Sequence, residues 1–207
     1  MHMTRLLRRP AHALRSLFVC GAIAASALLT GCASLYVDTA MKEVPVSEMK
    51  KVAQPKPTRV TFEFMTTGAP NAGATNLLRE AVLQQVKDSG LFAPVTAGAD
   101  AAMLTISLNN IPLTDDAARK GFVTGLTFGL AGSALTDGYV CTLSYLPIGN
   151  NTPIVKTERH AIHATIGNAS PPPGAGKPVD GTTAVKTMTR DIVSNALRDL
   201  SIDPTFN

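Results

Sequence analysis

The chain of 207 residues suits one domain of ordinary size, and its composition excludes a disordered protein, because 45% of its residues are apolar and only 16% are charged. Its formal charge of +4 does not indicate nucleic-acid binding. The first 31 residues hold four of the 19 basic residues and no acidic one, so the remainder balances 15 basic against 15 acidic residues. A neutral chain has no excess positive charge for phosphate backbones, and we predict no nucleic-acid partner.

Residues 1–31 have the three zones of an export signal. Residues 4–15 carry four arginines, residues 17–29 are apolar apart from Ser26, and small residues follow. This order of basic, apolar and small residues is typical of secretory signal peptides. The apolar run has 13 residues, whereas a membrane-spanning helix needs about 20. We therefore predict a signal peptide that is removed.

The signal ends in Leu29-Thr30-Gly31-Cys32, which resembles the lipobox of bacterial lipoproteins. The resemblance implies that the Cys32 thiol receives a diacylglyceryl group and that Cys32, N-acylated with a chain such as palmitate, becomes the first mature residue. Two or three acyl chains anchor a protein firmly. Ala33, in the place of an aspartate, implies sorting to the outer membrane. The alternative is an ordinary signal cleaved elsewhere, with Cys32 unmodified.

Residues 33–58 show no sustained hydrophobic period. They include three prolines and the basic pair Lys50-Lys51. Such a stretch is typical of a linker. We predict a tether over residues 32–58, followed by a single periplasmic domain over residues 59–207.

The first half of this domain contains two predicted strands and one helix. Residues 59–66 and 101–111 alternate apolar and polar side chains, as half-buried strands do, and Pro112 ends the second. A helix capped by Thr75 or Asn76 is predicted to run to about Ser89, with Gly90 at its C-terminal end.

Residues 121–136 have no charged side chain and carry a small residue at every fourth position: Gly121, Gly125, Gly129 and Ser133. A stripe of small residues lets helices approach closely in membranes. The segment is, however, shorter than a membrane-spanning helix. Buried packing, partner contact and membrane insertion all remain open, and the four small residues are candidates for partner contact.

The second half contains a predicted hairpin and a second helix. Residues 138–146 and 154–166 are rich in β-branched and aromatic side chains, which indicates two paired strands, and residues 168–178 form a Pro/Gly-rich loop. Residues 182–200 have the period of an amphipathic helix. Its predicted inner residues are Val185, Met188, Ile192, Ala196 and Leu197, and its predicted outer residues are Lys186, Arg190 and Asp191.

These elements predict an α+β fold with an antiparallel or mixed four-stranded sheet and two helices packed on one face. The element order resembles that of small periplasmic lipoprotein domains such as the curli-secretion channel lipoprotein. The resemblance adds one alternative function, a subunit of an oligomeric secretion channel that uses the Gly-rich segment.

No set of residues in the sequence indicates catalysis or metal binding. His160 and His163 are the histidines that follow the signal, and they are predicted to be strand-surface residues without a metal. Asp115-Asp116 and Asp137 flank the apolar segment and are expected to be solvated. Cys141 lies in an apolar run and is expected to be a buried small hydrophobe. There is no Gly-x-Ser-x-Gly elbow and no phosphate-binding loop.

The sequence therefore predicts a lipid-anchored outer-membrane protein with its domain in the periplasm. We expect a non-enzymatic, partner-binding component of envelope assembly, transport or maintenance that uses no cofactor. Its partners would be the membrane, through the lipid, and other envelope proteins. An enzyme that modifies envelope lipid or glycan is the remaining alternative.

Overall fold

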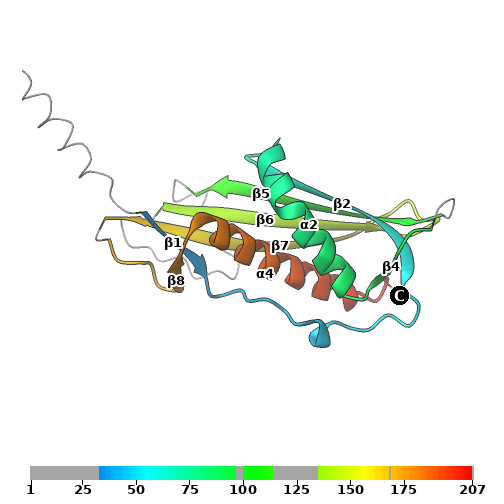
Figure 1. Cartoon of the computed structure of the whole chain (residues 1–207). Helices are drawn as coiled ribbons and strands as arrows, with labels where there is room; N and C mark the ends of the chain where they lie inside the picture. The colour runs from blue at the N-terminus through cyan, green and yellow to red at the C-terminus, as the bar shows by residue number, and fades with distance from the viewer. Residues whose placement is uncertain (1–32, 97–99, 114–134, 168, 207) are drawn as a thin grey trace, which may run out of the picture. The chain divides into compact units, whose positions relative to one another are not determined.

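The computed structural model describes residues 33–96, 100–113, 135–167 and 169–206 (Figure 1). Within these ranges lie two α-helices, a short 3-10 helix and eight strands. The helical elements are η1 (Val46–Glu48), α2 (Ala72–Asp88) and α4 (Gly181–Ser201). The strands are β1 (Ala33–Asp38), β2 (Lys56–Thr66), β3 (Ala69–Pro70), β4 (Phe92–Ala93), β5 (Ala102–Pro112), β6 (Leu135–Leu146), β7 (Ile154–Ile166) and β8 (Ala175–Val179).

The eight strands form one mixed sheet in the order β3-β2-β5-β6-β7-β1-β8, with β4 paired to β2. Strands β2 and β5 run parallel, while β5–β6 and β6–β7 are antiparallel. The predicted α+β class is confirmed, and all four predicted strands are present. The count of four strands was wrong because β1, β3, β4 and β8 have only two to six residues each. Strands this short show little alternation.

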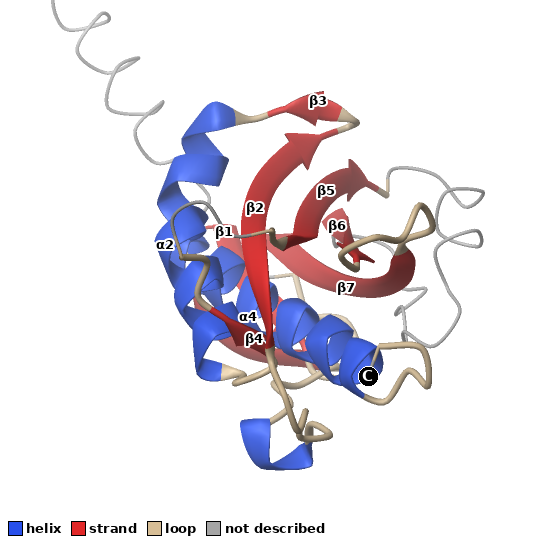
Figure 2. Cartoon of the chain, turned by 90° about the vertical axis from the view of Figure 1, so that its right-hand side faces the viewer, coloured by secondary structure: helices blue, strands red, loops and turns tan. Residues whose placement is uncertain are grey.

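Both helices cover the same face of the sheet (Figure 2). Helix α2 packs on β2, α4 packs on β6 and β7, and the helices contact each other. The core between these layers is mostly aliphatic, as expected for a chain without tryptophan. It includes Phe62, Phe64, Leu104, Ile106, Leu108, Leu78, Val82, Met188, Ile192 and Leu197.

Helix α2 begins four or five residues earlier than predicted. Its N-cap is Asn71, whose side chain accepts a hydrogen bond from the Ala74 N–H at 3.0 Å. Thr75, a predicted cap, lies inside the first turn, where its hydroxyl accepts a bond from the Phe64 N–H at 2.9 Å. The predicted end is correct, because Gly90 follows the helix with a φ of 68° that favours glycine.

Residues 33–58, predicted to be a tether, are part of the folded domain. Strand β1 pairs with β8 inside the sheet. Residues 39–55, here named the strap, then run beside α4. The Asn195 amide donates to the Lys42 carbonyl at 2.8 Å, and the Val44 and Lys50 N–H groups donate to hydroxyls of α4 at 2.9 and 3.0 Å. The sequence pattern missed this because the strap bonds to distant side chains and needs no period of its own.

Candidate functional site

The two histidines of β7 form the centre of a buried polar site. His163 Nε2 lies 3.0 Å from Asp38 Oδ2, and its Nδ1 lies 3.1 Å from Thr136 Oγ1. His160 Nε2 lies 3.5 Å from Asp191 Oδ2, and its Nδ1 accepts a hydrogen bond from the Ala161 N–H at 2.9 Å. Both imidazoles are fully buried. The prediction of strand-surface histidines is therefore wrong.

The two carboxylates come from the elements that flank β7. Asp38 ends β1, and Asp191 lies in the middle of α4. Asp191, predicted to point outward, is buried because β7 presents His160 beneath it. A buried carboxylate is tolerated only with a partner. The Asp38–His163 contact joins β1 to β7 within the sheet, and the longer Asp191–His160 contact lies between α4 and β7.

Thr136, His163 and Asp38 form a hydroxyl–imidazole–carboxylate chain, the group order of acyl-transfer triads. In such enzymes the hydroxyl faces the substrate cavity. Here the neighbouring hollow of about 240 Å³ is lined by the carboxylate end of the chain, Asp38, together with Asp191 and other residues, and Thr136 does not line it. The geometry supports a structural role for the chain.

The thiol of Cys141 is also buried and unreactive. Burial, reinforced by the negative charge of Glu158, raises the pKa of the Cys141 thiol to about 12. The thiol therefore stays protonated at neutral pH and behaves as the buried small hydrophobe that was predicted. Among the described residues, no three His, Cys, Asp or Glu side chains are grouped so that they could hold a metal ion.

A groove of about 900 Å³ lies between α2, α4 and the strap. Its apolar wall includes Leu77 and Val46, which are 48% and 47% exposed. Arg190 and Glu43 lie at its edge and pair at 2.9 Å. Exposed apolar side chains beside charged ones are typical of a surface that contacts another molecule.

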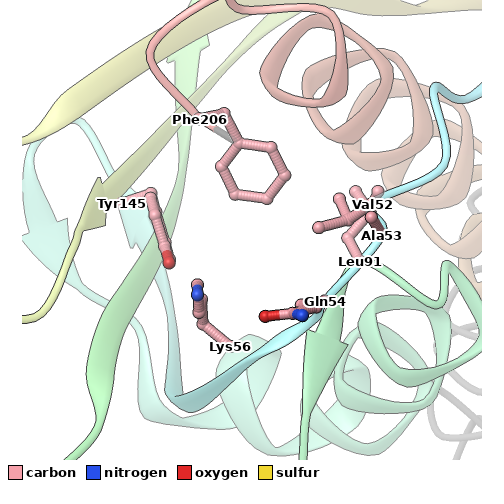
Figure 3. Close-up of a pocket in the computed structure, with 7 residues that line it drawn as sticks. All are labelled: Val52, Ala53, Gln54, Lys56, Leu91, Tyr145 and Phe206. Carbon is pink, nitrogen blue, oxygen red and sulfur yellow. The ribbon is translucent and has the colours of Figure 1, made fainter.

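A smaller pocket of about 230 Å³ lies where α4 ends (Figure 3). The rings of Tyr145 and Phe206 form one wall, with centroids 5.0 Å apart in an edge-to-face contact, and Lys56 and Gln54 line another part. Phe206 also contacts Phe92 at 5.8 Å. The ring of Phe206 covers this end of the core. The pocket was not predicted from the sequence because its residues come from separate segments.

The sequence-predicted site residues lie outside the described ranges. These are Cys32, Gly121, Gly125, Gly129 and Ser133, and Asp115-Asp116 lie there as well. Asp137 lies in β6, where burial raises its pKa and a bond from Asn110 opposes the rise. Asp38 was missed because it lies in the predicted tether.

Neither α-helix that the structure describes combines the length and the apolar character needed to cross a bilayer.

No family model matches the chain, and no curated protein is significantly similar to it. The chain is distantly similar to several solved structures, three of which follow. Protein XCC0632 from Xanthomonas campestris is 10% identical, with 78% of this chain and 94% of that chain covered and a TM-score of 0.39. A PelC variant dodecamer from Paraburkholderia phytofirmans is 9% identical, with coverages of 81% and 98% and a TM-score of 0.34. A candidate lipoprotein from Caulobacter crescentus is 13% identical, with coverages of 68% and 86% and a TM-score of 0.26. At these TM-scores none of them assigns a family or a function.

Proposed function

We propose that the chain is a lipoprotein of the outer membrane that presents its α+β domain to other envelope proteins in the periplasm. One observation carries the proposal: a basic zone and an apolar zone lead to Leu29-Thr30-Gly31-Cys32. The order of the zones is that of an exported protein. Among the four final residues, Cys32 supplies the thiol to which a diacylglyceryl group would be attached.

Two features of the described residues favour partner binding over catalysis. The histidines and their carboxylates are enclosed and hold elements together. The groove between the helices instead leaves apolar side chains such as Leu77 open to contact. A surface of this kind supports association with another protein.

Anchoring is tested by mass spectrometry of the mature N-terminus and by fractionation of cells. We expect a diacylglyceryl-modified Cys32, and loss of membrane association in Cys32→Ala. The matched control is Cys20→Ala, which changes a cysteine in the same signal segment and should remain fully anchored. An unmodified Cys32 in the mature chain contradicts the proposal.

Partner binding is tested with a photo-crosslinking residue at two leucines of α2 in intact cells. Leu77 lines the groove, whereas Leu83, which is 37% exposed, does not. We expect a defined envelope partner to be crosslinked from position 77 and not from position 83. Capture by the chain lacking residues 121–136 then shows whether that segment contributes. Equal, diffuse crosslinking from both leucines contradicts a specific partner surface.

A further inference from the structure

We infer that the domain lies directly on the membrane surface, with the end of the sheet where β1 begins facing the lipid. This inference rests on the proposed lipidation of Cys32. It adds an interaction surface, since a domain on a long tether would meet the bilayer with no preferred side. The molecule that this surface contacts is the lipid bilayer.

The first step is the length of free chain after the anchor. Leu35 is already paired with Val179 of β8, and only Ala33 and Ser34 separate it from Cys32. Three extended residues span at most about 11 Å. The strand is also held at its far end, because Asp38 is buried against His163 at 3.0 Å. A lipid on Cys32 would therefore keep the beginning of β1 within about 11 Å of the membrane surface.

The surface at the end of the sheet where β1 begins is formed by several strand ends. The beginning of β1 lies at the same end of the sheet as the beginning of β6 and the ends of β5 and β7 (Figure 1). The pairing of Pro112 with Asp137 places the end of β5 at the beginning of β6. Strand β7 ends in Ile166, which is 58% exposed. Ile166 is therefore an exposed position from which contact between this end and the membrane can be measured.

The opposite end of the domain is where α4 ends and β7 begins. Lys156, near the beginning of β7, pairs with Asp203 at 2.7 Å, so the end of α4 lies by the beginning of β7. The ten residues from Lys156 to Ile166 span about 33 Å of strand. Ile202, just after α4, is 55% exposed and lies at this far end. The chain thus offers two equally exposed isoleucines at opposite ends.

The experiment uses the full lipidated chain in vesicles of phosphatidylethanolamine and phosphatidylglycerol. Ile166→Cys and Ile202→Cys are each labelled with a fluorophore, and quenching by a lipid with a nitroxide on its headgroup is measured. Cys141 is fully buried, and the parent chain controls for its labelling. We expect several-fold stronger quenching at position 166 than at position 202. Equal quenching, or stronger quenching at position 202, overturns the inference.

A second variant separates orientation from anchoring. Twelve Gly/Ser residues inserted between Cys32 and Ala33 would span about 20 Å on average. We expect this insertion to reduce the difference between the two labels while the protein stays membrane-bound. An insertion that leaves the difference unchanged also contradicts the inference. The mass of the mature N-terminus distinguishes the two failures: an unlipidated Cys32 refutes the proposed function, and a lipidated Cys32 without preferred orientation refutes this inference alone.

Discussion

The two helices cover the same face of the sheet but are buried to very different extents. Helix α4 buries 12 of its 21 residues, whereas α2 buries four of its 17. Helix α2 packs on the sheet along one stripe. Helix α4 lies between the sheet and the strap, so part of its polar side is also enclosed, including Ser194 and Asn195. An amphipathic pattern therefore shows which side of a helix meets the core and does not show whether the other side meets water.

The largest difference between the helices is expected from truncating a leucine in each. Leu197 of α4 is completely buried, and Leu197→Ala should lower the free energy of unfolding by about 3–5 kcal/mol, through lost burial and the cavity left behind. Leu83 of α2 is 37% exposed, and Leu83→Ala should cost less than about 1 kcal/mol. Urea denaturation of both variants measures the two costs. Similar costs would mean that the helices are equally enclosed in solution.

The enclosure by the strap is tested with two amide side chains. Asn195 of α4 donates to the Lys42 carbonyl, and Gln85 of α2 donates to the Arg190 carbonyl, both at 2.8 Å. Asn195→Ala should cost about 1–3 kcal/mol because it removes a partly buried bond, whereas Gln85→Ala should cost less than about 1 kcal/mol because its bond is exposed. Thermal unfolding of the two variants provides the comparison. An Asn195→Ala chain as stable as Gln85→Ala would show that the strap is not held against α4.

The ends of the helices should show no such difference. Asp180 caps α4 and Asn71 caps α2, and each accepts a backbone N–H bond at 3.0 Å. Asp180→Ala and Asn71→Ala should therefore lower the free energy of unfolding by similar amounts. Chemical denaturation at neutral pH measures both. A much larger loss of stability in Asp180→Ala would mean that the N-terminus of α4, and not only its buried sides, stabilises this helix more than α2.

The last effect concerns pH and Glu158 of β7, whose carboxyl lies beside Asp199 in the C-terminal part of α4. Burial, together with a hydrogen bond and repulsion from Asp199, raises the pKa of Glu158 from 4.5 to about 7. The folded protein therefore binds this proton more tightly than the unfolded chain does. The resulting stability is fully present below pH 4.5 and is lost as the pH rises through about 7.

Glu158→Gln should remove this contribution, so the midpoint of thermal unfolding should fall less between pH 5 and pH 8 than in the unaltered chain. Glu63→Gln, which changes an exposed carboxyl of β2, is the matched control and should follow the unaltered profile. A Glu158→Gln profile identical to that of the unaltered chain would contradict the raised pKa.

The elements that were predicted correctly are those with a period of their own. The bounds of β5 differ from the prediction by one residue because its apolar and polar side chains alternate, and the bounds of β7 match because its β-branched residues distinguish it from the loops on either side. Strand β1 and the strap were missed because their stability comes from partners far along the chain. Asp38 and His163 are 125 residues apart, and Val44 and Ser194 are 150 apart. A local sequence pattern does not show which distant residues pair. The buried histidine site, which depends on such pairs, was therefore not predicted.

The contact between the strap and α4 has a consequence for the order of folding. An exported chain emerges with its N-terminal end first, yet β1 and the strap find their partners, β8 and α4, only in its last third. Contacts this distant along a chain form late and slow its folding. A lipid added at Cys32 would thus hold an unfinished domain at the membrane until the final helix has crossed.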